Sequence, residues 1–406
     1  MTVSAPSAGV RGSTATVRLK PKTDPRKIRH GFPWVYANEL VTDRRAKALT
    51  PGAFARLTDN TNKPLGLVAV NPVSKIFCRM LDRDPEAVVD QAWFAARLRK
   101  ALLLREKLFS TPFYRLIHAE ADGLPGVVID RFGATCVIQP NAAWADVHLS
   151  TLTEALTEVT GVQTVLKNAS GRARKLEGLD DKSGVLLGNM PGEPLRVPMN
   201  GALYLADVTG GQKTGLFYDQ RPNHAFVAAL SQGARVLDVF SHVGGFSLAA
   251  LAGGAQTALA VDASAGALSL ATGGAEAMGV GSRLAVRQGD AFDVLADLGS
   301  EGAQFDVVIC DPPAFAPSKP ALEAGLRAYE RIARLAAPLV AEGGILGLCS
   351  CSHAAELNAF RNASARGIGR AGRDAVLIYT GFAGPDHPQL PQLGQSGYLK
   401  SLFFQI

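Results

Sequence analysis

Cys351 is the residue whose type and position most directly indicate covalent chemistry. It follows the apolar run GILGLCS, an expected strand, so it should lie on a loop at the edge of a sheet. A thiolate in such a place can add to C6 of a cytosine, which makes C5 able to take a methyl group from a sulfonium ion. Nearby positive charge, including that of the sulfonium ion, would lower the thiol pKa. Cys349, two residues earlier, is expected to be buried, and an inert core thiol is the alternative for Cys351.

The run DPPAF at 311–315 carries a second set of reactive and binding groups. Paired prolines hold a loop extended, which would fix the Asp311 carboxylate beside a cofactor while Phe315 stacks on a base. Such a run after a strand is typical of enzymes that methylate nucleobases, and an ordinary loop is the alternative. A base must also remove the C5 proton of a cytosine, and Asp311 and His353 are candidates.

A third set of residues is suited to an adenosine cofactor. Two adjacent glycines in FSHVGGF, at 240–246, would let the backbone approach a ligand and leave amides for its carboxylate. Asp262 follows the next expected strand and could accept both ribose hydroxyls, with a helix N-cap as the alternative. Asp290 is placed to meet the adenine. The absence of GxGxxG disfavours a dinucleotide. The expected contacts from the loop are Phe240, Ser241, Gly244 and Gly245.

A mostly parallel sheet must bring these three sets together. Apolar strands alternate with helices from ARVLDVF onward, which indicates a parallel sheet covered on both faces, with ligands at the carboxyl ends of its strands. The chain then closes with two strands, DAVLIYTGFA and YLKSLFFQI, that have no helix between them. This predicts the α/β, Rossmann-like, seven-stranded sheet of class I methyltransferases, with S-adenosylmethionine as cofactor. The hairpin RVPMNGALYLADV, whose Asn200-Gly201 predicts a type I′ turn, precedes it.

The N-terminal part is basic and rich in short strands. Residues 1–100 hold 18 Lys and Arg against 8 Asp and Glu, a net charge of +10 in a chain whose total is +6. This favours contact with a polyphosphate such as RNA, with a solvated basic surface as the alternative. ATVRLK, GAFARLTD, PLGLVAV and KIFCRML predict a small β-barrel, and its RHG-P-W-V–N-E pattern resembles a PUA domain. The expected phosphate contacts are Arg26, Lys27 and Arg29, next to aromatic residues Phe32, Trp34 and Tyr36, the last two of which are equally consistent with core positions.

The length of 406 residues indicates two or three domains. We expect a PUA-like barrel at 14–84, a central α+β domain at 85–194 and a methyltransferase domain at 195–406. In the central segment the acids Glu120, Asp122 and Asp130 could bind a ligand, although turns and caps are their commoner roles.

Composition excludes several classes of protein. The sequence contains no apolar run of about 18 residues, so we expect no membrane span, and its start lacks the apolar core of a secretory signal. Five cysteines without a CxxC pair favour reduced thiols, no metal site and a cytoplasmic location. The oligomeric state is open, and a homodimer is among the assemblies we consider.

An ordered set of motifs extends this interpretation: GLFYDQRPN (Gly215–Asn223), LDVFSHVGGFSLAALAGGA, VDAS, GDAF, DPPAF with PSK, SCSH, and DHP with YLK. From about Val17 onward the chain resembles the bacterial large-subunit ribosomal RNA cytosine-5 methyltransferase family. The resemblance implies a PUA domain, a central α+β domain and a class I methyltransferase domain, with large-subunit ribosomal RNA as partner. It also implies residue roles: Asp219, Gln220 and Arg221 over the cofactor, with Arg221 toward the RNA, Asp262 and Asp290 at the adenosine, Cys351 as nucleophile, and Asp386 and His387 near the target base.

Three positions depart from the family pattern. His242 stands where an aromatic residue is common, Ala314 stands where a lysine is frequent, and Cys349 is additional. The glycines of the loop are intact, so the departures bear on the target nucleotide more than on the cofactor.

Two other functions are consistent with the motifs. The DPPAF segment could hold an exocyclic amine, so that an adenine or guanine nitrogen is methylated without a covalent intermediate. The chain could also be a non-catalytic RNA-binding assembly factor that keeps the cofactor for stability. Replacing Cys351 with alanine would spare the first alternative.

Overall fold

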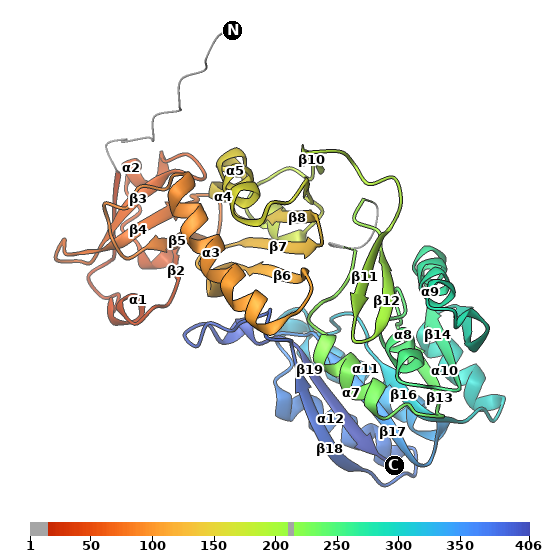
Figure 1. Cartoon of the computed structure of the whole chain (residues 1–406). Helices are drawn as coiled ribbons and strands as arrows, with labels where there is room; N and C mark the ends of the chain where they lie inside the picture. Colours follow the sequence, from red (N-terminus) through yellow and green to blue (C-terminus); the bar gives the residue numbers. More distant parts are fainter. Residues whose placement is uncertain (1–14, 210–214) are drawn as a thin grey trace. The chain divides into compact units, whose positions relative to one another are not determined.

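The structure, a computed structural model, describes residues 15–209 and 215–406, so the expected domain start at residue 14 lies outside the described residues. Its contacts divide the chain into two compact units (Figure 1). The first ends at Met190 and includes Pro388–Ser396, and the second holds Pro191–His387 and Gly397–Ile406. Within the described ranges, no helix is long and apolar enough to span a bilayer.

The first unit begins with a five-stranded sheet of order β1-β3-β4-β5-β2. Strand β1 runs parallel to β3, and the other pairs are antiparallel. Alternation along β3 buries Ala55 and Leu57, which is the pattern expected for a half-buried strand. The elements are β1 (Ala15–Arg18), β2 (Trp34–Tyr36), β3 (Phe54–Thr58), β4 (Pro64–Val70), β5 (Ile76–Asp82), α1 (Arg26–Arg29) and α2 (Arg44–Lys47).

The first unit continues with a second sheet, of order β10-β9-β8-β7-β6. Trp144 stacks on Phe94, with ring centroids 5.9 Å apart, in the core between this sheet and its helices. The Asp90 carboxylate caps α3 by accepting a hydrogen bond from the Trp93 amide. The elements are α3 (Gln91–Leu108), α4 (Ala143–Val147), α5 (Leu149–Thr160), α6 (Arg172–Leu176), β6 (Phe113–His118), β7 (Val127–Phe132), β8 (Thr135–Pro140), β9 (Thr164–Lys167) and β10 (Gly184–Leu187).

Buried ion pairs account for the acids of this region. The Arg79 guanidinium of β5 bridges Glu120 at 3.1 Å and Glu177 at 2.9 Å, and the Trp34 indole N–H also donates to Glu120. These contacts fasten the first sheet to the segment that follows it. Two further pairs, Arg105 with Asp122 and Arg115 with Asp130, lie within the second sheet and its helices, so all three acids have structural partners.

The second unit opens with the hairpin of β11 (Leu195–Met199) and β12 (Ala202–Ala206). Asn200 and Gly201 have φ angles of 54° and 75°, both positive as a type I′ turn requires, which confirms the turn expected from the sequence. The Asn200 side-chain amide donates to the Arg221 carbonyl at 2.7 Å and so ties the turn to the helix that begins there.

The seven-stranded sheet of this unit has the order β15-β14-β13-β16-β17-β19-β18. Its first five strands are parallel, and β19 is antiparallel to both of its neighbours, as the sequence predicted. The strands are β13 (Arg235–Val239), β14 (Thr257–Asp262), β15 (Leu284–Gln288), β16 (Phe305–Cys310), β17 (Val340–Ser350), β18 (Val376–Phe382) and β19 (Lys400–Gln405).

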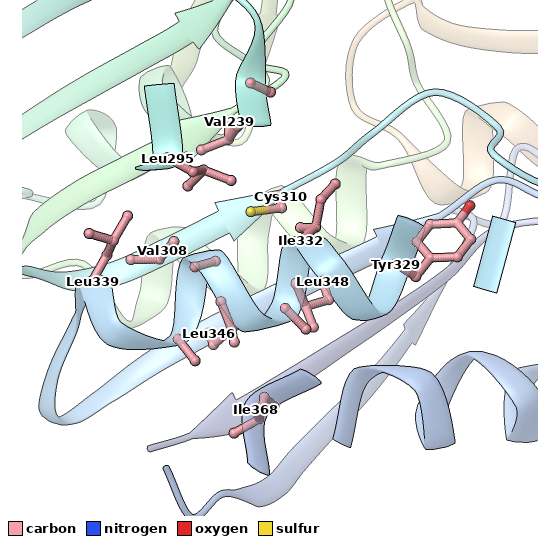
Figure 2. Close-up of a cluster of buried hydrophobic side chains, with 14 of the residues drawn as sticks. Val239, Leu295, Val308, Cys310, Tyr329, Ile332, Leu339, Leu346, Leu348 and Ile368 are labelled. Carbon is pink, nitrogen blue, oxygen red and sulfur yellow. The ribbon is translucent and has the colours of Figure 1, made fainter. Parts of the chain in front are cut away.

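Two groups of helices pack on this sheet. One group packs with β12 and consists of α7 (Arg221–Ala229), α8 (Gly245–Ala252) and α9 (Ala265–Ala277). The other group consists of α10 (Ala291–Ser300), α11 (Leu322–Ala336) and α12 (Leu357–Arg370). Figure 2 shows apolar side chains of β16, β17 and α11 meeting in a buried cluster, among them Val308, Leu346 and Ile332. Burying each such side chain stabilises the fold by about 1.5–3 kcal/mol, which holds the carboxyl ends of the strands in register.

Candidate active site at the carboxyl ends of the parallel strands

The loop between β13 and α8 has a strained backbone. Phe240 and His242 have φ angles of 64° and 51°, and Gly244 has 81°. Left-handed conformations are uncommon for residues with a side chain and often mark functional loops. At the start of α8 the Gly245 amide donates to the Ser241 carbonyl and the Ser247 amide donates to Asp238, so contact of these amides with an anionic group stays a prediction.

Asp238, inside β13, holds the start of α8 through hydrogen bonds, a role that sequence reasoning missed. Its Oδ2 atom accepts hydrogen bonds from the Ser247 amide and hydroxyl, each at 2.8 Å. Complete burial raises the pKa of Asp238 to about 6, although these hydrogen bonds act in the opposite direction. An acid inside the apolar run VLDVF could have signalled this role, because a buried carboxyl group requires hydrogen-bond partners.

Gly245 is required by packing as well as by any ligand. A Cβ atom on Gly245 would lie 2.9 Å from the His224 Nε2 atom, and the Tyr204 hydroxyl of β12 donates to the Gly245 carbonyl at 3.0 Å. Burial, together with the charge of Arg221, lowers the pKa of His224 to about 3, so this imidazole is neutral. Tyr204 of the hairpin and His224 of α7 thus pack against the loop at Gly245.

Asp262 is tied to the same loop. Its Oδ2 atom accepts from the His242 amide and its Oδ1 atom from the Ser264 amide, both at 2.9 Å, and its side chain is half-buried. The N-cap of α9 is Ser264, so the alternative that Asp262 caps this helix is wrong. Asp290, in contrast, does cap α10, and its contact with adenine stays a prediction.

Gln220 and Asp311 meet, although 90 residues lie between them in the sequence. The Gln220 Nε2 atom donates to the Asp311 Oδ2 atom at 2.9 Å, and the Asn223 amide donates to the Gln220 Oε1 atom at 2.6 Å. Asn223 also donates to the Phe382 carbonyl, which links α7 to β18. The structure therefore brings the DQR and DPPAF segments together.

The DHP segment lies against the DQR segment. The Gly384 amide donates to the Asp219 carbonyl at 2.9 Å, and the Asp386 Oδ1 atom lies 3.0 Å from the His387 Nδ1 atom. The Tyr398 hydroxyl donates to the Asp219 carboxylate at 2.6 Å. Burial lowers the pKa of Arg221, and the nearby Asp386 carboxylate opposes this shift. Tyr398 had no signal in the sequence beyond its place in YLK.

The two cysteines of β17 and its following loop differ in environment. Cys349 is 1% exposed, and burial raises its pKa well above the usual range, with Asp311 adding to the shift. Cys351 is half-buried and lies directly after the strand. The predicted burial of Cys349 is confirmed, and Cys351 is the more accessible thiol.

The loop that carries Cys351 is anchored to the DPPAF loop. The Ser352 hydroxyl accepts from the Ala316 amide at 2.9 Å, and the Tyr329 hydroxyl lies within hydrogen-bond distance of Ser350 and Ser352. Phe315, from the same segment, packs against three aromatic rings, those of Phe240, Phe292 and Tyr329. Stacking of Phe315 on a nucleobase stays a prediction.

The basic residues of the first unit are partly engaged within that unit. Lys27 pairs with Glu39, and the Arg29 Nη2 atom lies 2.7 Å from the Asp59 Oδ2 atom. The side chain of Arg26 is 80% exposed. Of the three predicted phosphate contacts, Arg26 is thus the one that extends furthest into solvent.

Comparisons with known proteins agree with this geometry. A family profile for S-adenosylmethionine-dependent methyltransferases matches residues 147–404, and one for PUA-like domains matches residues 17–83. The chain belongs to the S-adenosylmethionine-dependent methyltransferase family, and its cofactor is S-adenosylmethionine.

Named relatives cover nearly the whole chain. The chain is 34% identical to the ribosomal RNA large subunit methyltransferase I of Cronobacter sakazakii, over 91% of this chain and 93% of that protein. It is also 34% identical to a ribosomal RNA large subunit methyltransferase of Deinococcus radiodurans, over 97% of this chain and 98% of that protein. A solved methyltransferase structure complexed with S-adenosylhomocysteine superposes with a TM-score of 0.82 at 19% identity, covering 97% of this chain and all of that one, and so shares the fold.

The site residues fit the cofactor chemically. Asp262 offers a half-buried carboxylate at the end of β14, beside the strained loop between β13 and α8. The residues predicted to hold the cofactor, an assignment that stays a prediction, are Asp219, Gln220, Phe240, Ser241, Gly244, Gly245, Asp262, Asp290 and Asp311.

Proposed function

We propose that the protein methylates C5 of a cytosine in large-subunit ribosomal RNA, with Cys351 as the nucleophile. The names of its relatives support the RNA substrate. The observation that carries the chemistry is the half-buried Cys351 thiol on a loop fastened, through Ser352 and Ala316, to the DPPAF loop. The buried Cys349, with its raised pKa, is a poor nucleophile by comparison.

The reaction requires a thiolate, a bound cytosine and a base. The Cys351 sulfur forms a bond to C6, and the C5–C6 π electrons become available at C5. S-adenosylmethionine, when bound, supplies the methyl group as an electrophile on sulfur. A base then takes the C5 proton, the C5–C6 double bond re-forms and the thiolate leaves. Asp311 and His353 are the candidates for this base, and Asp311 is held in place by Gln220.

Each unit carries basic or aromatic groups that we assign to RNA contact. Lysine and arginine side chains contact phosphates in a salt-dependent way, and a base turned out of its stack reaches the catalytic edge. The residues we assign to RNA contact are Arg26, Lys27, Arg29, Arg221, Phe315 and His387.

A trapping experiment tests this proposal. Fluorine at C5 cannot be removed as a proton, so a 5-fluorocytosine ribosomal RNA should stay bound to the cysteine after methyl transfer. We expect wild type and Cys349→Ala to form a denaturation-resistant adduct with this RNA and the cofactor, and Cys351→Ala to form none. Methyl transfer to unmodified RNA by Cys351→Ala, with no adduct from wild type, would overturn the proposal in favour of nitrogen methylation.

A further inference from the structure

Lys400 places a buried positive charge beneath the loop of Cys351. It is the first residue of β19 and pairs with Ser350, the last residue of β17. Its side chain belongs to a residue only 6% exposed, and its Nζ atom donates to the Ser352 carbonyl at 2.8 Å and the Ala355 carbonyl at 2.7 Å. The ammonium group thus holds the backbone segment that directly follows Cys351 in the chain.

A buried ammonium ion is costly unless an opposite charge or strong acceptors compensate it. Burial lowers the pKa of Lys400, whereas Cys351 and Glu356 act in the opposite direction. Glu356 is exposed at the start of α12, where water screens its charge. The thiolate of Cys351 is therefore the nearby anion that water screens less. Attraction between the Lys400 ammonium group and this thiolate must favour the charged form of each residue.

We propose that Lys400 is a positioning residue for the cytosine-5 reaction, which both holds the Cys351 loop and favours the thiolate over the thiol. The inference rests on the proposed function, because it gives the nucleophile of that reaction its charge before the cofactor contributes any. It extends the function to a residue from the closing strand of the sheet, far from the DPPAF and glycine loops in sequence.

Other titratable groups face the same loop and must be separated from Lys400. The Tyr329 hydroxyl, from α11, bonds to Ser350 and Ser352, and burial raises its pKa, so it stays protonated near neutral pH. His353 follows in the loop itself, with its ring 5.6 Å from that of Tyr398. The Asp311 carboxylate comes from the loop after β16. A His353→Gln variant reports the contribution of the imidazole.

The test is the pH dependence of Cys351 alkylation by iodoacetamide, followed on its peptide by mass spectrometry in the full-length protein. Lys400→Gln keeps amide donors for the two carbonyls but removes the charge. We expect Lys400→Gln to raise the pH midpoint of Cys351 alkylation by about one pH unit or more, with roughly tenfold slower alkylation at neutral pH. Lys400→Arg keeps the charge and should restore most of the shift.

A matched control is Arg373, whose guanidinium lies at the start of β17, whereas Lys400 acts near the end of that strand. The Arg373 guanidinium donates to the Ala337 and Val340 carbonyls, where β17 begins, and β17 spans 11 residues. Arg373→Met removes a cation that clamps two carbonyls without touching the Cys351 loop, and we expect its midpoint to equal that of wild type. If Lys400→Gln and Lys400→Arg both leave the midpoint unchanged, Lys400 is a structural clamp alone and the inference is wrong.

The alkylation assay and the trapping assay test the two proposals separately. Alkylation reports the thiol whichever base the enzyme methylates, whereas the adduct with 5-fluorocytosine reports the reaction. An unmoved midpoint with a normal wild-type adduct overturns the role of Lys400 alone. A shifted midpoint without any adduct overturns the proposed function and leaves the coupling between Lys400 and Cys351 in place.

Discussion

The Gln220 side-chain amide donates a hydrogen bond to the Asp311 carboxylate at 2.9 Å, which joins the start of α7 to the loop after β16. Asn223 accounts for the orientation of this amide, because it donates to the Gln220 oxygen and leaves the nitrogen facing Asp311. A fixed donor holds the Asp311 carboxylate in one orientation. The relationship makes Gln220 a sensitive position for testing the site.

Gln220→Glu should lower methyl transfer by at least about tenfold, because two facing carboxylates raise each other's pKa and repel. The ratio of variant to wild-type rate should rise as the pH falls, since protonation of one carboxyl group relieves the repulsion. Rates of labelled methyl transfer to ribosomal RNA between pH 6 and 9 check this. Gln405→Glu, on an exposed amide that donates to the Gly343 carbonyl, is the matched control. A constant ratio across the range would contradict the prediction.

Asp262→Asn should weaken cofactor binding by about tenfold or more, because it removes the charged acceptor proposed for the ribose and weakens the grip on the His242 amide. Calorimetric titration with S-adenosylhomocysteine measures the change. Asp306→Asn is the control, since Asp306 accepts from the Arg235 amide where β13 begins, at the opposite edge of the sheet. Equal affinities in the two variants would show that Asp262 holds the loop without binding the cofactor.

Gly245→Ala should destabilise the second unit by about 1–3 kcal/mol, because its methyl group would lie 2.9 Å from the buried His224 Nε2 atom, closer than van der Waals contact allows. The free energy of unfolding in urea measures this. Gly299→Ala in α10 meets no atom within 4 Å and should be neutral or stabilising. Combining Gly245→Ala with His224→Ala should cost less than the sum of the two changes, and strict additivity would refute the packing argument.

Asp238 should make stability fall as the pH rises from about 4 to 6. The folded chain holds this proton up to a pKa of about 6, whereas the unfolded chain releases it near 3.8, so the unfolded state gains up to about 3 kcal/mol in relative stability over this range. Asp238→Asn should remove that loss, as urea midpoints measured from pH 4 to 8 will show. Asp306→Asn should change the profile in the opposite sense, at low pH, because the Asp306 pKa is lowered in the fold. Parallel profiles for wild type and Asp238→Asn would exclude this role.

The sheet could be predicted from the sequence because its strands are short apolar runs, each followed by a helix or turn signal. Burial of Cys349 could be predicted from its place inside such a run. The partners of the site residues could not be predicted in the same way. Tyr398 contacts Asp219, and Lys400 contacts the Cys351 loop, across more than 40 residues of sequence, and no local pattern records such contacts.

The acidic partners of basic residues could not be predicted from the sequence either. A basic run next to aromatic residues predicted phosphate contact, yet Lys27 and Arg29 have acidic partners in the fold. The partner of Arg29 is Asp59, on a turn where hydrogen bonds from Thr61 and Lys63 hold the Asp59 pKa at about 2. Charge counts along a sequence thus overstate the charge that remains available at the surface.

The bridge from Arg79 to Glu120 and Glu177 limits how this protein can be taken apart or recombined. A first sheet excised after β5 would keep Arg79 but lose both of its counter-ions, and the remainder would expose two acids that had shared one guanidinium. Where a replacement for the first sheet covers the two acids without supplying a guanidinium, the uncompensated buried charge costs about 3–5 kcal/mol, a large share of the stability of a small domain. A chimaera that replaces the first sheet with another RNA-binding domain should therefore carry an arginine at the position equivalent to Arg79.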